Sequence, residues 1–489
     1  MKMNRELLLD SAPDMIRAAI LEDGKLAEIL TERQADTEQA ESIYLGRVQM
    51  VRKSLGAAFV DIGEELNAFL PLEEGTALHA GDLLIVQGAA RQTTDSKGLR
   101  ITSRINLAGK WIVLTPGQAS VHVSKKVKDP AVREALRDFA ESIRPDGCGL
   151  IVRTASSDVT EEKLREEVQL LVQRWKAICE KAAGMTKPGL LDRREKLDLR
   201  LVRDLAGLTR VITNSKRDYE ALDAALRACQ PAQSVSVEYF DERSQLIFDA
   251  FSIEGQIDKA LKKRVWLPCG GYIIFDACEA MTVIDVNSGK MVLGKDKEDT
   301  ALRVNLEAAD EIARQIRLRD IGGIILTDFI DMREEANRKA LVERMKAASK
   351  ADRAQVTVEG LTRLGLLEMT RKRVHAPLRK SLRISCSYCS GSGEVLSGEE
   401  TARRALRQIR RLRISGQRGP FVIQCAPGVF SALCGLYAPE DICVYAAEMA
   451  GRHAERFDIT QIGEGIPLPK GAVTLRPYSF EDNLSGTNQ

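Results

Sequence analysis

Residues 303–332, RVNLEAADEIARQIRLRDIGGIILTDFIDM, carry the pattern that decides the fold. The first half places apolar residues three and four positions apart, which predicts an amphipathic helix. The residues of its apolar face are Leu306, Ala309, Ile312, Ala313 and Ile316. Gly322 and Gly323 end the helix. The run IILTDFI after them is almost continuously apolar, which predicts a strand buried on both sides of a sheet.

A second strand is predicted just before this helix, in residues 281–290, MTVIDVNSGK. Apolar and β-branched residues form the strand, and the turn-forming letters NSG end it. Strand, helix and strand together predict a βαβ-like crossover whose two strands can be neighbours. Asp285 and Asp328 then lie toward the carboxyl ends of those strands, at the edge where open α/β sheets gather ligand sites.

Aspartates in apolar strands require an explanation, because buried carboxylates are rare without a partner. Asp285, Asn287 and Asp328 offer hard oxygen ligands, and Mg²⁺ is typically held by one or two protein carboxylates together with substrate phosphates. Such an ion activates water and neutralises charge on a phosphodiester. The spacing also leaves a structural alternative open, in which Asp285 caps a turn and Asp328 pairs with an arginine.

Length and composition set the class of protein. A chain of 489 residues predicts two to four domains, and 44% hydrophobic with 29% charged residues is ordinary for a soluble globular protein. The net charge of +2 decides nothing, but basic residues gather in residues 370–383 and 402–413. No apolar run approaches a membrane span, no signal-peptide core is present, and the ten cysteines are scattered like intracellular thiols. These features predict a cytoplasmic protein.

The rest of the chain alternates between strand-rich and helical segments. A hairpin is predicted near the N-terminus with Asp23-Gly24 as its turn, and residues 42–72 show short alternating strands typical of a small barrel. A helix is predicted at DPAVREALRDFAESIR, a strand at GLIVRTAS, and a long helix from Thr160 to about Ala183.

Two pairs of residues are candidates for RNA contacts. Phe59 and Phe69 lie in the barrel pattern, and barrels of this type stack bases on aromatic rings; the alternative is that the rings fill the barrel core. Arg153 and Thr154 end the GLIVRTAS strand, and an arginine fork with a hydroxyl can grip a terminal phosphate. An ordinary surface arginine is the alternative. The basic residues 371–383 fit an RNA backbone or a solvated linker equally well.

The segment CSYCSGSG places Cys386 and Cys389 at the spacing of a zinc knuckle. A closed structural zinc site needs four ligands, and neither a second CxxC nor a suitably spaced histidine lies nearby in the sequence. The simplest completion is the same pair from a second chain, which predicts a two-fold dimer sharing one Zn²⁺. A redox-active pair and two idle thiols are the alternatives.

Four segments in this order resemble the ribonuclease E/G family of bacterial endoribonucleases, and the likeness extends over essentially the whole chain. They are TVIDVNSGK, NLEAADEIARQIRLRDIGGIILTDFIDM, GLLEMTRKR and CSYCSGSG. The resemblance implies that Asp285 and Asp328 bind the catalytic Mg²⁺ and that Asn287 assists them, whereas Asp331 is not a family ligand. Ser387 departs from the proline that the family usually has after the first cysteine, which costs the knuckle some rigidity but no ligand.

The resemblance also implies roles for the other candidates. Phe59, Phe69 and Lys97 match RNA contacts of an S1 domain, and Arg153 and Thr154 match a pocket that senses a 5′-monophosphate. Cys386 and Cys389 match a zinc link between subunits. Whether dimers associate further is left open.

The fold that the resemblance implies is multidomain, with α/β and α+β parts. A ribonuclease H-like domain is expected in 1–36 and 200–279, an inserted S1 (OB) barrel in 37–120 and a 5′-sensor in 121–199. A DNase I-like catalytic domain is expected in 280–382, the zinc link in 383–396, and a small dimerisation domain in 397–489.

The activity expected on these grounds is Mg²⁺-assisted cleavage of single-stranded, A/U-rich RNA that leaves 5′-phosphate and 3′-hydroxyl ends. Ribosomal RNA precursors, at the 5′ end of the small-subunit RNA, and messenger RNA are the expected substrates. Two rivals are a non-catalytic RNA-binding protein and a small-molecule phosphatase, the latter giving no role to the barrel aromatics.

Overall fold

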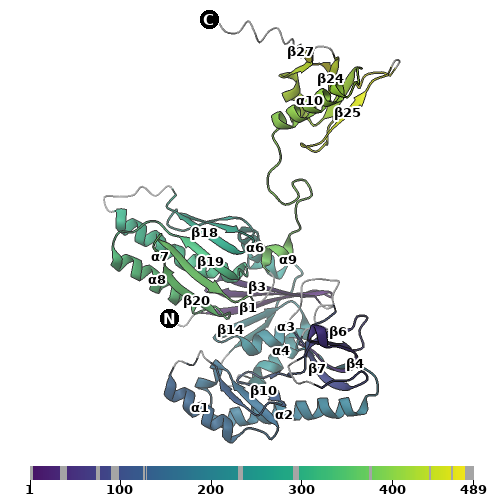
Figure 1. Ribbon diagram of the computed structural model, residues 1–489. Helices are drawn as coiled ribbons and strands as arrows, with labels where there is room; N and C mark the ends of the chain where they lie inside the picture. The colour runs from purple at the N-terminus through teal and green to yellow at the C-terminus, as the bar shows by residue number, and fades with distance from the viewer. Residues whose placement is uncertain are drawn as a thin grey trace. The chain divides into compact units, whose positions relative to one another are not determined.

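The computed structural model describes residues 4–33, 41–72, 77–89, 98–124, 127, 129–229, 235–289, 297–373, 377–439, 442–463 and 466–478. The chain divides into two compact units, Met1–Ser381 and Leu382–Gln489. Figure 1 shows their helices and strands and labels many of them. Among the described helices, none combines the length and the apolar character that a membrane crossing requires.

A six-stranded sheet contains both aspartate-bearing strands. Its order is β16 (Arg264–Trp266), β17 (Tyr272–Ala277), β18 (Met281–Asn287), β19 (Gly323–Asp328), β21 (Leu366–Arg371) and β20 (Val356–Leu361). Strands β18 and β19 are parallel and are connected through α7 (Lys297–Leu318), whereas the other neighbours are antiparallel. The predicted strand–helix–strand crossover is confirmed.

One face of this sheet packs against α7 and α8 (Glu335–Ser349), which lie side by side (Figure 1). The core includes Ile284, Ile325 and Leu367 from the sheet and Val304, Ile312 and Leu341 from the helices. The opposite face is more open, since Ile324 is 48% exposed. The prediction that the IILTDFI strand is buried on both sides is therefore wrong. Successive side chains of a strand point to opposite faces, and only one face meets the two helices.

A five-stranded sheet joins segments far apart in the sequence, in the order β15 (Ser236–Tyr239), β14 (Leu208–Thr213), β1 (Arg5–Ser11), β2 (Met15–Glu22) and β3 (Lys25–Arg33). Helices α3 (Leu197–Asp204) and α4 (Lys216–Cys229) contribute to one core beside it, and α5 (Ile247–Ala250) and α6 (Ile253–Ala260) to another. Asp23 and Gly24 both have positive φ, as a tight β2–β3 hairpin turn requires, so the predicted turn is confirmed.

The predicted small barrel is a sheet in the order β6 (Ala68–Pro71), β5 (Ala57–Asp61), β4 (Ile43–Arg52), β7 (Leu83–Gly88) and β8 (Ile101–Thr102). A short helix, η1 (Lys53–Leu55), connects β4 and β5, and β13 (Gly189–Asp192) also pairs with β4. A bridge between Phe69 and Arg100 links the two ends, so the barrel is nearly closed.

A four-stranded sheet follows, in the order β11 (Val121–Val123), β12 (Cys148–Val152), β10 (Ile112–Pro116) and β9 (Leu107–Ala108). It packs with α1 (Pro130–Ser142), which Asp129 caps, and with α2 (Glu161–Gly184); the turn after β12 is η2 (Thr154–Asp158). Strands β9 and β10 lie within the expected 37–120 segment and pair with each other, but β10 also pairs with β12, which lies beyond that segment. The six domain boundaries stay predictions.

The second unit has its own core between α10 (Gly398–Ile414), α11 (Pro427–Cys434) and a four-stranded sheet. The sheet order is β25 (Phe457–Gln461), β22 (Phe421–Cys425), β24 (Val444–Glu448) and β26 (Val473–Thr474), and β23 (Tyr437–Pro439) pairs with β27 (Arg476–Tyr478). Helix α9 (Leu378–Leu382) ends at the first residue of this unit, and residues 383–397 form turns and extended chain without helix or strand.

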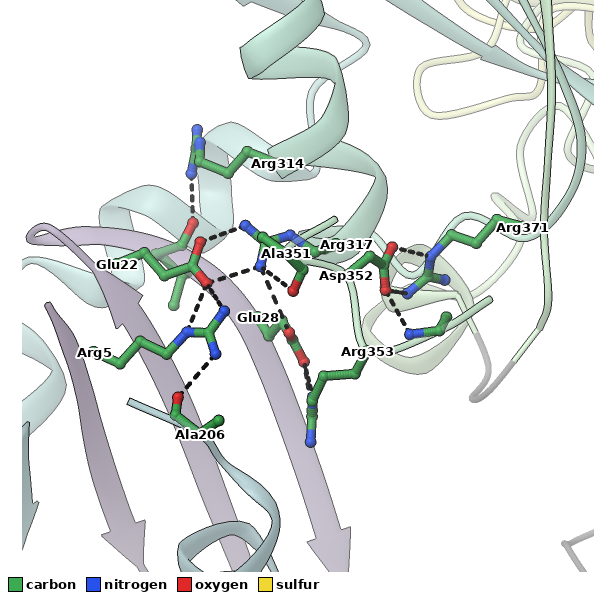
Figure 2. A network of polar contacts seen from close by, with 12 residues as sticks. Arg5, Glu22, Glu28, Ala206, Arg314, Arg317, Ala351, Asp352, Arg353 and Arg371 are labelled. Atoms are coloured by element: carbon green, nitrogen blue, oxygen red, sulfur yellow. Dashed lines mark hydrogen bonds and ion pairs between the residues drawn. The ribbon is translucent and has the colours of Figure 1, made fainter. Parts of the chain in front are cut away.

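A network of arginines and carboxylates joins the five-stranded sheet to α7 (Figure 2). Arg317 of α7 is buried and donates from Nη1 and Nη2 to Glu22 of β2, over 2.9 and 2.5 Å. Arg5 of β1 donates to the same carboxylate. The helix behind the aspartate-bearing strands is therefore attached to the N-terminal sheet through buried charge.

Candidate active site

Asp285 and Asp328 are register partners on the neighbouring parallel strands β18 and β19. Partners in adjacent strands have backbones about 4.8 Å apart and side chains on the same face. Because Ile284 and Ile325 pack against the helices, the two aspartates point to the open face of the sheet. The sequence prediction that the fold brings these carboxylates together is confirmed, although 43 positions separate them in the chain.

The electrostatics around Asp328 favour a cation. The pKa of its carboxyl is raised, first by partial burial and then by the negative charges of Asp285 and Asp331. Within the residues described, neither Asp285 nor Asp328 forms an ion pair with an arginine or lysine, so the structural alternative for Asp328 gains no support. Asp331 is exposed, and its negative charge is one of those that act on Asp328.

Asn287 lies two residues beyond Asp285, on the same face of β18. Its Nδ2 donates to Asp285 Oδ2 over 2.6 Å, which fixes the carboxylate and leaves Asn287 Oδ1 as a further oxygen donor. The described residues contain no group of three or more His, Cys, Asp or Glu side chains suited to a metal. Two carboxylates and one amide fit Mg²⁺, because this ion takes few protein ligands and keeps water or phosphate oxygens for the rest.

The segment after β19 is fixed by residues to which the sequence assigned no role. Asn305 of α7 is fully buried, donates from Nδ2 to Ile330 O over 2.8 Å and accepts from Ile330 N over 3.0 Å. Glu298 accepts the backbone N–H groups of Arg333 and Glu334, over 3.0 Å each. An asparagine in the apolar pattern of the helix was the available signal, since buried polar side chains need partners.

Phe59 and Phe69 are register partners on β5 and β6, with ring centroids 6.0 Å apart. Both rings are half-buried, and the barrel core is formed instead by their neighbours Ala58, Val60 and Leu70. Strand alternation therefore places the two rings on the outer surface of the barrel, against the alternative that they fill its core. Lys97 lies outside the described residues.

Arg153 and Thr154 follow β12, as the sequence predicts. Nη1 of Arg153 donates to Gly109 O over 2.6 Å and to Asp204 Oδ1 over 2.7 Å. Burial acts to raise the pKa of Asp204, but Arg203 and Arg153 outweigh it, so the pKa is lowered and the carboxylate is charged. Thr154 Oγ1 lies 3.0 Å from the hydroxyl of Ser124. An incoming phosphate would compete with Asp204 for this arginine.

Cys386 and Cys389 are free thiols in a tight turn of the second unit. The N–H of Gly393 donates to Cys389 Sγ over 3.3 Å, and N–H bonds from Gly393 and Gly391 lower the pKa of that thiol. A stabilised thiolate is the form that binds zinc. Tyr388 lies between the two cysteines in the sequence, and the ring of His453 packs against its ring with centroids 4.2 Å apart. The sequence did not indicate this contact, because 65 positions separate the two residues.

Comparison with known proteins defines the class of the chain. The model of the ribonuclease E/G family matches residues 106–374, a range that includes both aspartate-bearing strands and α7. Ribonuclease G of Escherichia coli (strain K12) is 34% identical over 88% of this chain and 93% of its own length. The chain therefore belongs to the ribonuclease E/G family.

Other relatives agree in extent. Ribonuclease G of Haemophilus influenzae is 32% identical over 87% of this chain and 91% of its own length. Ribonuclease E of Nostoc sp. is 36% identical over 78% of this chain but only 57% of its own length. The chain thus matches proteins named ribonuclease G over nearly their full length, and a ribonuclease E over little more than half.

Proposed function

We propose that this chain is a Mg²⁺-dependent endoribonuclease whose metal is held by Asp285 and Asp328. As a member of the ribonuclease E/G family it is an enzyme that acts on RNA phosphodiester bonds. The observation that carries the metal assignment is the register pairing of the two carboxylates on the open face of the sheet. Among the helices that the structure describes, none covers them as α7 and α8 cover the opposite face, so a polymer phosphate can approach.

Each residue of the site has a separate task. Asp285 and Asp328 supply the charge that holds the ion, and Asn287 orients Asp285 through its 2.6 Å hydrogen bond. Asn305 holds the backbone that follows Asp328. Bound Mg²⁺ supplies an activated water and neutralises charge on the phosphate. Attack of water at phosphorus with departure of the 3′-oxygen leaves a 5′-phosphate and a 3′-hydroxyl.

The substrate is single-stranded, A/U-rich RNA, with faster cleavage when the 5′ end is a monophosphate. Phe59 and Phe69 on the outer barrel surface are suited to stack on bases, and the guanidinium of Arg153 with the hydroxyl of Thr154 is suited to bind a terminal phosphate. Precursors of small-subunit ribosomal RNA and messenger RNA are the proposed targets, and the cytoplasm is the proposed location. The S1, 5′-sensor, ribonuclease H-like and DNase I-like assignments belong to the same proposal.

The experiment compares cleavage of a 5′-monophosphorylated single-stranded oligoribonucleotide by the parent protein and by Asp285→Asn and Asp328→Asn. Both variants should lose cleavage and retain RNA binding, because each removes ligand charge without removing a packed side chain. Asp276→Asn is the matched control: Asp276 lies on the same face of the sheet but pairs with Lys263 over 2.5 Å. Full activity of Asp285→Asn would refute the assignment, and a parent protein that binds without cutting would indicate the non-catalytic rival.

A further inference from the structure

The open face of the catalytic sheet carries an aromatic pair close to the two aspartates. Trp266 of the edge strand β16 pairs in register with Tyr272, and Tyr272 pairs with Asn287. Asn287 follows Asp285 by two residues on β18, so both side chains are on one face of the sheet. The row Trp266–Tyr272–Asn287 therefore lies on the same face as Asp285 and Asp328. At about 4.8 Å per strand, the Trp266 backbone is about 10 Å from that of Asn287.

Trp266 is unusually accessible for a tryptophan, at 60% exposed. Its ring meets the Tyr272 ring edge-on, with centroids 5.3 Å apart at 61°, so Tyr272 supports the indole from one side. The chain has three tryptophans, and the other two, Trp111 and Trp175, pack against a hydrophobic core. The exposed indole, supported by Tyr272 on an edge strand, therefore presents a flat apolar surface to solvent.

A cation accompanies the rings. The guanidinium of Arg264 lies 4.5 Å from the centroid of Tyr272 and 5.8 Å from that of Trp266. Arg264 is exposed, and in the part of the chain that the structure describes it makes no ion pair with a carboxylate. It stands in the same register row as Asp285 and Asp328, through Ile274 of β17.

We propose that Trp266, Tyr272 and Arg264 form a subsite that stacks a base of single-stranded RNA next to the phosphodiester held at Asp285 and Asp328. The inference rests on the proposed nuclease function and adds a base-stacking contact to it. Aromatic rings stack any base, and an arginine beside them compensates phosphate charge, which is how single strands are held without sequence readout. Placement on the aspartate-bearing face favours RNA over a second copy of the chain as the occupant.

Binding is measured in the Asp328→Asn background, which stops cleavage without a chelator that would remove zinc. Intrinsic fluorescence should be quenched by a single-stranded oligoribonucleotide, and Trp266→Phe should remove the quenching while preserving most of the affinity. Trp266→Ala should raise the Kd about 5- to 150-fold, the range that corresponds to about 1–3 kcal/mol for one stacked base. Tyr239→Ala is the matched control, since Tyr239 is an edge-strand aromatic, 39% exposed, with Lys216 Nζ 5.5 Å from its ring.

Oligonucleotides with a single abasic site locate the stacked base. One position should lose as much affinity as Trp266→Ala does, and the two losses should not add. Equal Kd values for Trp266→Ala and its parent would overturn the subsite, as would a loss that is the same for every abasic oligonucleotide. A changed sedimentation coefficient with unchanged RNA binding would assign the rings to contacts between copies instead. Cleavage by Asp328→Asn itself would overturn the proposed metal site separately.

Discussion

Replacing Arg317 by methionine tests whether buried charge attaches α7 to the N-terminal sheet (Figure 2). Arg317 makes hydrogen bonds of 2.9 and 2.5 Å to Glu22, and the two side chains are only 6% and 10% exposed. Removing one partner of a buried pair typically costs about 3–5 kcal/mol, because the other charge stays buried. Arg5 remains at 2.9 Å from Glu22, so we expect the lower end, about 3 kcal/mol.

The assay is urea unfolding followed by circular dichroism, at pH 7 and at a series of lower pH values. Burial acts to raise the pKa of Glu22, but Arg317 and Arg5 outweigh it, and the pKa lies below its ordinary value of 4.5. A lowered pKa in the folded state contributes stability that is present above about pH 4.5 and is lost as the pH falls through the folded value. Arg317→Met should flatten this acid dependence.

A double variant provides the control. Replacing Glu22 by leucine together with Arg317→Met removes both charges, and should cost less than the sum of the two single changes because no unpaired carboxylate remains. Arg227→Met is a matched surface change, since Arg227 is 80% exposed in its pair with Asp223 and should cost less than about 1 kcal/mol. A loss below about 1 kcal/mol for Arg317→Met, or strict additivity in the double variant, would refute the reasoning.

Two further predictions concern the other candidate residues. Cys386→Ser should abolish bound zinc and weaken the proposed dimer, because a shared site loses one ligand from each chain. Metal analysis and sedimentation at low concentration measure these two effects. Cys434→Ser is the control, since Cys434 is an exposed cysteine in the same unit. An unchanged sedimentation coefficient in a zinc-free Cys386→Ser protein would contradict the shared site. Arg153→Ala should lower cleavage of 5′-monophosphorylated RNA toward the rate for 5′-hydroxyl RNA and leave the latter rate unchanged, whereas Arg174→Ala, which breaks a comparable 2.7 Å pair with Asp192, should leave the ratio unchanged. Equal losses on both substrates would indicate that Arg153 acts by holding Asp204.

Local pattern was sufficient where an element is determined by its own residues. The amphipathic helix and the strand that ends at Asp328 follow from the spacing of apolar residues, and the Asp23-Gly24 turn follows from residue types that tolerate positive φ. The pattern was insufficient for burial on both faces of β19, because an apolar run does not say how many faces of its sheet will be covered. That depends on where α7 and α8 pack.

The candidate site divides in the same way. The sequence motifs indicated Asp285, Asn287 and Asp328, and the strand–helix–strand pattern predicted that the two aspartate-bearing strands can be neighbours. The exposed pair of Trp266 and Tyr272 was not found, since exposure and cross-strand register are properties of the assembled sheet. Nor was the contact of Arg153 with Asp204, which brings together residues 51 positions apart.

The sequence by itself therefore determined the types of element, the membership of the ribonuclease E/G family and the identity of the acidic residues. All three depend on residues that are close together in the chain, either in a periodic pattern or in a short contiguous motif. Only the tertiary structure decided the register that sets Asp285 beside Asp328, the single covered face of their sheet, and the burial of Arg317 against Glu22. Register and burial result from packing among segments that are distant in the sequence. The residues of any one segment therefore do not determine them.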